Sequence, residues 1–216
     1  MQHFRRLAEG IAPAALLAKL EATPELWQEI TVRQDYADSA HKHTETIFLR
    51  GPDAFDWQTV QGGFSAKNYP ALAILADPIG PILDRLCFDL QVSELGRVML
   101  VNLKSRCGIS PHTDEGAYAE HFSRIHVALK SEVGNAFMCG GEMIHMKPGE
   151  AWWFDHQTEH KVDNDSIADR IHLIIDLVSP KVPSPRPGIA EMIASLEALP
   201  SFQKIVSGLQ WPQENT

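Results

Sequence analysis

Residues 123–178 contain four short segments with the composition of β-strands, which read SRIHVAL (123–129), MIHM (143–146), AWWF (151–154) and RIHLIIDLV (170–178). The first alternates polar and apolar side chains with period two, as a strand with one buried face does. The last is rich in β-branched residues. Turn signals separate the segments, namely Gly134-Asn135, Gly140-Gly141 and the run from Lys147 through Pro148 and Gly149 to Glu150. This pattern predicts a mainly β protein with flanking helices, built as a double-stranded β-helix of the jelly-roll, cupin-like type.

Residue types that bind metals stand at a regular spacing around these strands. His112 and Asp114 are two positions apart, so their side chains point to the same side of an extended chain. His160 follows the segment at 151–154. Two histidines and one carboxylate form the ligand set that holds non-haem Fe(II) and leaves coordination positions open. The sequence therefore predicts a metal site made of His112, Asp114 and His160.

Arg170 lies ten positions beyond His160 and begins the segment with the highest β-branched content. A guanidinium is planar and suits bidentate recognition of a carboxylate better than lysine does. Next to an iron site, this arginine predicts the binding of a dicarboxylate co-substrate. An oxygenase is the leading interpretation.

Five ordered pieces of the sequence resemble the aspartyl/asparaginyl β-hydroxylase family, which includes free-amino-acid hydroxylases such as the proline cis-hydroxylases. They read ISPHTD (109–114), RIH (124–126), GEAWWFD (149–155), EH (159–160) and RIHLIID (170–176). The resemblance implies an Fe(II)- and 2-oxoglutarate-dependent dioxygenase built on a double-stranded β-helix. Such an enzyme uses O2 to hydroxylate an unactivated C–H bond of an amino acid or peptidyl substrate and releases succinate and CO2.

The resemblance also implies residue roles. His112, Asp114 and His160 match the iron ligands, and Arg170 matches the residue that pairs with the distal carboxylate of 2-oxoglutarate. Arg124 and His126 match an Arg-x-His pair that lines the co-substrate pocket in this family. The animal β-hydroxylases of the family have Gly in place of Asp114, so this chain resembles more closely the bacterial amino-acid hydroxylases with a full triad.

Two other classes of function fit the same residues. A cupin-type hydrolase or isomerase would hold zinc or manganese on the same ligands, and Arg170 would have no required role in it. A non-catalytic β-helix that binds a small carboxylate or a protein partner would retain its function without His112 or His160.

Other histidines compete for a metal or need no role. His156 and His160 have the spacing of a zinc pair on a helix, but they follow a strand, and a turn is expected there. His41 and His43 stand beside the apolar run 46–49 and are interpreted as two exposed residues at a strand edge, with the border of a substrate pocket as the alternative. Two histidines alternate with apolar neighbours and need no function, namely His145 and His172.

Composition limits the classes of partner and the compartment. A chain of 216 residues with 44% hydrophobic residues can bury one core, and its net charge of −9 argues against a nucleic-acid partner, which needs a basic face. No apolar run is long enough to span a membrane, and residues 1–6 do not open a signal peptide. Cys87, Cys107 and Cys139 form no CxxC pair, which predicts reduced thiols and a cytoplasmic protein. Cys107 is interpreted as a small buried apolar residue.

Residues 1–180 are expected to form one domain. Helices are predicted at 13–20 and from Pro24, together with two helical pieces within 71–86, separated by Pro78 and Pro81. A further strand is expected at 95–103. Residues 181–216 are expected to form a proline-rich arm and a C-terminal helix at 189–199, and the arm is a candidate contact of a homodimer.

Overall fold

The computed structural model describes residues 1–35, 39–52 and 66–186. The chain forms two compact units, Met1–Pro185 and Arg186–Thr216, and every helix and strand described below belongs to the first. The predicted C-terminal helix at 189–199 lies outside the described residues, and the dimer contact assigned to the arm stays a prediction.

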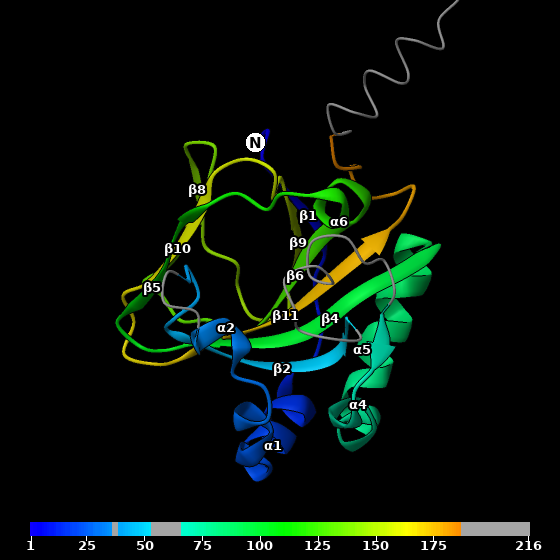
Figure 1. Ribbon diagram of the computed structural model, residues 1–216, viewed down its shortest axis with the longest axis vertical. Helices are drawn as coiled ribbons and strands as arrows, with labels where there is room; N and C mark the ends of the chain where they lie inside the picture. Colours follow the sequence, from blue (N-terminus) through cyan, green and yellow to red (C-terminus); the bar gives the residue numbers. More distant parts are fainter. Residues whose placement is uncertain (36–38, 53–65, 187–216) are drawn as a thin grey trace, which may run out of the picture. The chain divides into compact units, whose positions relative to one another are not determined.

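Two antiparallel sheets make up the first unit (Figure 1). The larger sheet has seven strands in the order β1 (Phe4–Ala8), β9 (Ala151–Phe154), β6 (Ser123–Lys130), β11 (Arg170–Val178), β4 (Glu94–Leu103), β2 (Thr44–Gly51) and β3 (Lys67–Asn68). The smaller sheet has four strands in the order β5 (Cys107–His112), β10 (His160–Asn164), β7 (Asn135–Cys139) and β8 (Glu142–Ile144). This mainly β architecture is the jelly roll predicted from the strand and turn pattern.

Short helices accompany the sheets, namely α1 (Ala14–Ala22), η1 (Pro24–Gln28), α2 (Val32–Asp35), α4 (Pro70–Ile74), α5 (Ala76–Leu90) and α6 (Ala117–His121). Figure 1 shows α1, α4 and α5 on the side of the larger sheet that faces away from β5, β8 and β10. Leu173, Ile175 and Leu177 of β11 are buried in one apolar cluster with Leu16 of α1 and Ile79 of α5. Because side chains alternate along a strand, the even-numbered residues of β11 point into the space between the sheets.

A second apolar cluster joins the two sheets. Phe154 of β9 packs with Phe137 of β7 and Val162 of β10, and Cys107 is packed at the edge of the same cluster. Cys107 packs against apolar residues as expected of a small apolar residue, but it is partly buried and not fully buried as predicted. These contacts hold β10, and with it His160, against the inner face of the larger sheet.

Two expectations about local structure are wrong. The predicted break within 71–86 exists, but it falls at Leu75 between α4 and α5, whereas Pro78 and Pro81 lie inside α5. Pro78 is in the first turn, where no N–H partner is needed, and Pro81 frees only a carbonyl at the exposed start of the helix. His41 and His43 belong to the turn before β2 rather than to a strand edge.

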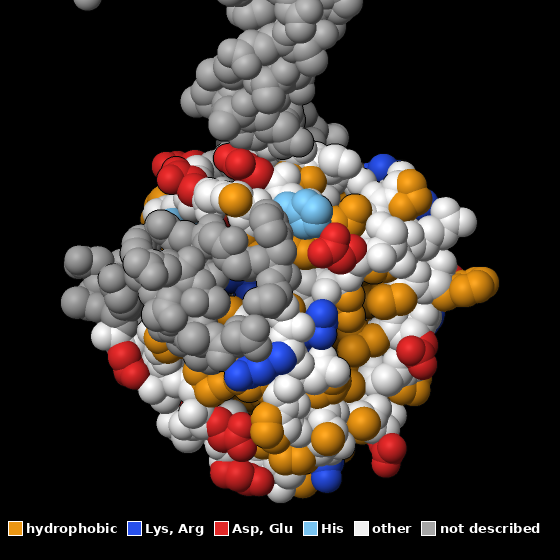
Figure 2. Space-filling model, turned by 45° about the vertical axis from the view of Figure 1, so that its right-hand side comes forward, with side chains coloured by type: hydrophobic (Ala, Val, Ile, Leu, Met, Phe, Trp, Pro, Cys, Tyr) orange, Lys and Arg blue, Asp and Glu red, His pale blue; other side chains and the backbone are white. Residues whose placement is uncertain are grey.

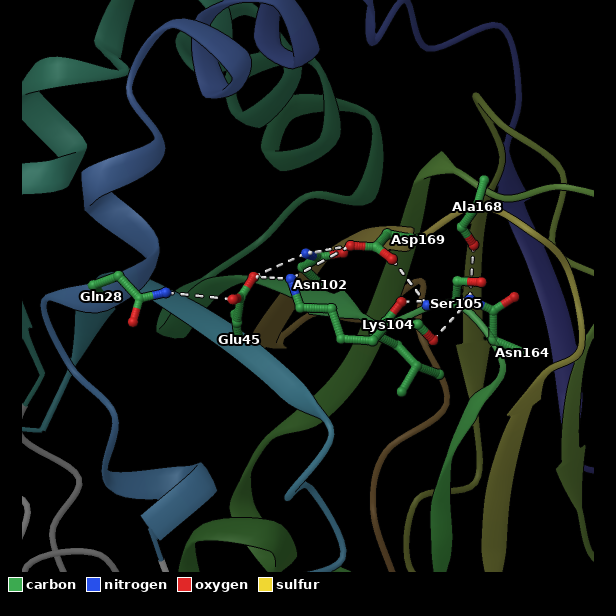
Figure 3. Close-up of polar contacts among 9 residues, drawn as sticks. Gln28, Glu45, Asn102, Lys104, Ser105, Asn164, Ala168 and Asp169 are labelled. Atoms are coloured by element: carbon green, nitrogen blue, oxygen red, sulfur yellow. Dashed lines mark hydrogen bonds and ion pairs between the residues drawn. The ribbon is translucent and has the colours of Figure 1, made fainter.

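A polar network fixes the start of β11, which carries Arg170 (Figure 3). The carboxylate of Asp169 accepts hydrogen bonds from the backbone N–H of Ser105 at 2.8 Å and from the Asn102 amide at 3.1 Å. Lys104 donates to Asp169 at 3.4 Å and to Glu45 of β2 at 2.6 Å. The residue before Arg170 is therefore tied to β4 and to the loop that follows it.

Asn164 at the end of β10 completes the network. It is fully buried, and its amide donates to the carbonyls of Leu103, Lys104 and Ala168 at 3.4, 3.1 and 2.9 Å. These bonds give hydrogen-bond partners to backbone carbonyls that are removed from water and would otherwise have none. The loop between β10 and β11 is thereby held in one conformation, and the strand bearing His160 is linked to the strand bearing Arg170.

On the face seen in Figure 2, some of the Lys and Arg side chains of the described residues lie near the middle of the view, and most of the acidic ones lie toward its rim. Within the described parts of the chain, no helix has the length and apolar character needed to cross a bilayer.

Candidate functional site

The three predicted metal ligands come together where the smaller sheet faces the larger one. The antiparallel pairing of β5 with β10 sets His112 directly opposite His160, and their ring centroids are 4.3 Å apart. Asp114 follows β5, and its backbone N–H donates to the carbonyl of His156 at 3.0 Å. One ligand atom from each of the three residues lies within 4.8 Å of the other two. A group of this size and composition fits a single divalent ion.

Backbone carbonyls orient both imidazole rings of this cluster. Nδ1 of His112 lies 2.8 Å from the carbonyl of Ser110, and Nδ1 of His160 lies 2.9 Å from the carbonyl of Thr158. A carbonyl only accepts, so each Nδ1 carries the proton and donates, and each Nε2 is left with a free lone pair. This is the arrangement in which an imidazole binds a metal through Nε2 while its other nitrogen is held in place.

Burial keeps the His160 ring neutral. The ring is largely removed from water, and this burial lowers the pKa of His160 to about 4. Neutral imidazole is the form that binds a metal. At neutral pH, the His160 ring is already neutral and can bind a metal without first losing a proton.

A chain of charged groups holds the third candidate ligand. Nη1 of Arg124 donates to Oδ2 of Asp114 at 2.6 Å, and Nε and Nη2 donate to the two oxygens of Asp176 at 2.7 and 3.0 Å. Nε of Arg97 lies 3.2 Å from Asp176 on its other side. Burial opposes ionisation of Asp114, but Arg124 and then His160 hold the pKa of that carboxyl well below its usual range. Asp114 is therefore a carboxylate at neutral pH.

Arg170 is buried on β11, away from the three candidate ligands, and the residue is 3% exposed. Nη2 donates to Nδ1 of His172 at 2.9 Å, which in turn lies 3.4 Å from Nδ1 of His126 on β6. The Phe137 ring lies 5.8 Å from the guanidinium. The predicted pocket residues Arg170 and His126 are thus neighbours through His172, whereas Arg124 is bound to the Asp114 side of the site.

No carboxylate among the described residues forms an ion pair with Arg170. Burial without a nearby negative charge lowers the pKa of Arg170 to about 9. Burial followed by the charge of Arg170 also lowers the pKa of His172 well below its usual range, so that ring is neutral. A buried guanidinium without a counter-ion is costly, and an anionic ligand would remove that cost.

The other histidines lie outside the metal-ligand group. Nε2 of His156 donates to the carbonyl of Ala119 at 3.0 Å, and His156 is absent from the only group of potential ligands found in the described residues. His43 is exposed, whereas the His41 ring packs edge-on against His112 with centroids 5.0 Å apart. His145 contacts the hydroxyl of Ser131 at 3.1 Å.

Sequence reasoning overlooked the residues that support the site. Asp176 and His172 lie on the same face of β11 as Arg170, and this could have been read from the period-two alternation of the segment. Arg97, the second partner of Asp176, stands on β4, whose pairing with β11 cannot be read from the sequence. His172, which had been given no function, contacts Arg170 directly.

A model of the family described as aspartyl/asparaginyl beta-hydroxylase matches residues 24–180 of this chain. The chain belongs to this family. The matched part of this β-hydroxylase family member includes all of residues 112–170, which carry the ligand group and Arg170.

Two comparisons add detail on this family member. An L-proline cis-4-hydroxylase of Rhizobium meliloti (strain 1021) is 29% identical over 151 residues, which are 68% of this chain and 52% of that protein. The chain thus spans about half the length of this curated relative. The crystal structure of an oxidoreductase of the 2OG-Fe(II) oxygenase family from Burkholderia pseudomallei has a TM-score of 0.54 at 13% identity and covers 86% of this chain and 89% of its own. This likeness shows the shared fold.

Acid is expected to destabilise the β-hydroxylase family member through Asp176. Burial alone would raise the pKa of the Asp176 carboxyl. The positive charges of Arg124 and then Arg97 outweigh this effect and hold the pKa below its usual range. The folded protein therefore binds this proton less readily than the unfolded chain does. The stabilisation is fully present above the unfolded pKa of about 3.9 and is lost as the pH falls from there through the folded pKa.

Urea unfolding between about pH 3 and pH 6 measures this effect, with Asp176→Asn as the comparison. We expect the variant to be less stable at pH 6, because Arg124 and Arg97 lose a buried counter-ion. Its stability should also vary less with pH than that of the wild type. Equal pH slopes for the two proteins would contradict the assignment.

Proposed function

We propose that this protein is an Fe(II)- and 2-oxoglutarate-dependent dioxygenase that hydroxylates an unactivated C–H bond of an amino acid or amino-acid-like substrate. The observation that carries the proposal is the pairing of two features in one member of this family. One is the group of His112, Asp114 and His160, and the other is Arg170, a buried arginine on β11 of the larger sheet that has no counter-ion among the described residues. The L-proline cis-4-hydroxylase relative supports the amino-acid class.

His112, Asp114 and His160 would hold the iron. The two Nε2 atoms and the Asp114 carboxylate suit an ion of the Fe(II) type, and three protein ligands leave positions open for other molecules. Bound there together with 2-oxoglutarate and O2, the iron supplies the oxidation that puts a hydroxyl group on carbon and releases succinate and CO2. The protein contributes binding, orientation and fixed charge.

Arg170 would bind the distal carboxylate of 2-oxoglutarate. The guanidinium presents a planar fork of donors in a buried environment, where a charge-assisted pair with a carboxylate is strong. His172 accepts one N–H and thereby fixes the direction of the fork. His126 contacts His172 on one side and the Phe154 ring on the other, and Phe154 packs against His160. His126 would line the space that the co-substrate occupies between Arg170 and the iron ligands.

Arg124 would act first as a positioning residue for Asp114. Its Nη1 holds one carboxylate oxygen, and its bidentate pair with Asp176 fixes the guanidinium. The other oxygen of Asp114 is then left for the metal. A direct contact of Arg124 with the co-substrate, implied by the family resemblance, remains part of the proposal.

Anaerobic titration of the Fe(II)-loaded protein with 2-oxoglutarate tests the proposal. We expect a weak visible absorption band from the chelated keto acid, saturating at one equivalent. Adding O2 and an amino-acid substrate should then release succinate. Zn(II) or Mn(II) binding at the same residues without such a band or succinate would instead favour the cupin-type hydrolase or isomerase.

A further inference from the structure

A second arginine that has no counter-ion among the described residues reaches the space between the sheets from the N-terminal part of the chain. Arg33 belongs to α2 and is partly buried. Its Nη1 lies 3.4 Å from the hydroxyl of Thr46 on β2 and 3.5 Å from the sulfur of Met99 on β4. The distance to Thr46 is long for a hydrogen bond from a cation, and the thioether of Met99 is a weak acceptor. The described residues therefore satisfy the guanidinium poorly.

The acids near Arg33 are already committed to other cations. Arg33 interacts electrostatically with Asp114 and Asp176. Both carboxylates already accept hydrogen bonds from Arg124, and Asp176 also pairs with Arg97. Asp35, on the same short helix, accepts a hydrogen bond from Thr31 instead. Among residues 1–35, 39–52 and 66–186, no carboxylate forms an ion pair with Arg33. Burial, followed by the charges of Arg124 and Arg97, lowers the pKa of Arg33 to about 10.

His41 supplies a second unsatisfied group on the same side of the metal ligands. Nδ1 of His41 is buried without a hydrogen-bond partner among the described residues. The ring packs against His112, and after burial it is the charge of Arg33 that most lowers the pKa of His41. His41 thus borders the candidate iron ligand His112, and Arg33 lies close enough to His41 and to Asp114 for their charges to interact. Among the described residues, both side chains have unused hydrogen-bonding capacity.

Strand register separates Arg33 from the pocket of Arg170. On the inner face of the larger sheet, His126 of β6 stands opposite Ile174 of β11, which stands opposite Met99 of β4. Arg170, His172 and His126 occupy the β6 and β11 side, whereas the contacts of Arg33 are on β4 and β2. Within the part of the chain that the structure describes, the site therefore has two cationic positions without counter-ions, on different pairs of strands. One 2-oxoglutarate molecule has only one distal carboxylate.

We propose that Arg33, with His41 beside it, binds the free carboxylate of the substrate, so that the substrate is a free α-amino acid rather than a residue within a peptide. This inference rests on the proposed function, because it presumes that Arg170 takes the co-substrate. An internal peptide residue has an amide in place of this carboxylate and offers no negative charge to Arg33.

The surroundings of Arg33 also indicate the class of side chain. Met99, which contacts the guanidinium, belongs to an apolar cluster with Phe48, Val101 and Ile174 on the inner face. A carboxylate held at Arg33 would place the adjoining carbon atoms of a small substrate over this apolar surface. An aliphatic or cyclic aliphatic side chain is the class that fits, because a charged side chain would lose water there without a partner.

Binding to the protein loaded with Fe(II) and 2-oxoglutarate under anaerobic conditions tests the inference without turnover. The probes are the standard L-amino acids, each used as the free acid and as its primary amide, and the readout is the change in the visible band or the heat of binding. We expect at least one aliphatic free acid to bind about 30-fold or more tightly than its amide. Arg33→Gln should bring this ratio close to one, and Arg33→Lys should retain part of it.

The matched control is Arg5→Gln, an exposed arginine of β1 that should behave as the wild type. In Arg33→Gln, the affinity for 2-oxoglutarate and the melting temperature should stay at wild-type values, which a loss of folding would not allow. Unchanged discrimination between acid and amide in Arg33→Gln would overturn the inference, as would binding of peptides but not of free amino acids. A wild-type protein that binds no 2-oxoglutarate would overturn the proposed function and this inference with it.

Discussion

His160→Ala is expected to bind Fe(II) at least about 100-fold more weakly than the wild type, since even the loss of a group that only orients a ligand costs 10- to 100-fold. His160 is one of three ligands, and its Nδ1 bond to the Thr158 carbonyl already directs Nε2 toward His112 and Asp114. Alanine removes this donor, and two ligands remain. Hydroxylation should fall below detection for the same reason.

Anaerobic titration with Fe(II), followed by calorimetry or competition with a chelator, measures this loss. His43→Ala is the matched control, because it is also a histidine-to-alanine change but lies on the surface outside the ligand group. Its Fe(II) affinity should equal that of the wild type. If His160→Ala bound Fe(II) within about threefold of the wild type while folded, the assignment of His112, Asp114 and His160 as one metal site would be wrong.

Arg170→Ala is expected to weaken 2-oxoglutarate binding by roughly 30-fold or more, the range seen when one partner of a buried hydrogen-bonded charge pair is removed. The guanidinium has no carboxylate partner of its own in the described structure, so the co-substrate would supply it. Without co-substrate, the variant should be as stable as the wild type or more stable, because it loses an uncompensated buried charge.

Comparing 2-oxoglutarate with 2-oxobutyrate, which lacks the distal carboxylate, isolates the contribution of Arg170. The wild type should prefer 2-oxoglutarate strongly, Arg170→Ala should lose most of that preference, and Arg170→Lys should retain part of it because lysine lacks the planar fork. Arg85→Ala, an exposed arginine on α5, is the control. An unchanged preference in Arg170→Ala would contradict the assignment and favour the hydrolase or isomerase alternative.

The sequence predicted a strand or helix correctly where its formation depends on neighbouring residues. The strand at Arg170–Val178 and the strand at Ala151–Phe154 have the predicted bounds, because β-branched and aromatic runs between Gly and Pro turns have few alternatives. The break within 71–86 was placed at the wrong residue because proline is tolerated near a helix start. The turn at His41 was missed because alternation over three residues is too short to distinguish a strand.

The fold class, the family and the candidates His112, Asp114, His160 and Arg170 could all be predicted from the sequence, because side-chain alternation, turn chemistry and ordered motifs are properties of neighbouring residues. Which charged side chains meet became known only from the folded structure. Arg124 is shared between Asp114 and Asp176, and Arg33 reaches the same space from a short helix far away in the chain. Strand pairing and burial make these contacts, and they depend on residues distant in sequence, so no local pattern encodes which buried arginine is left without a partner.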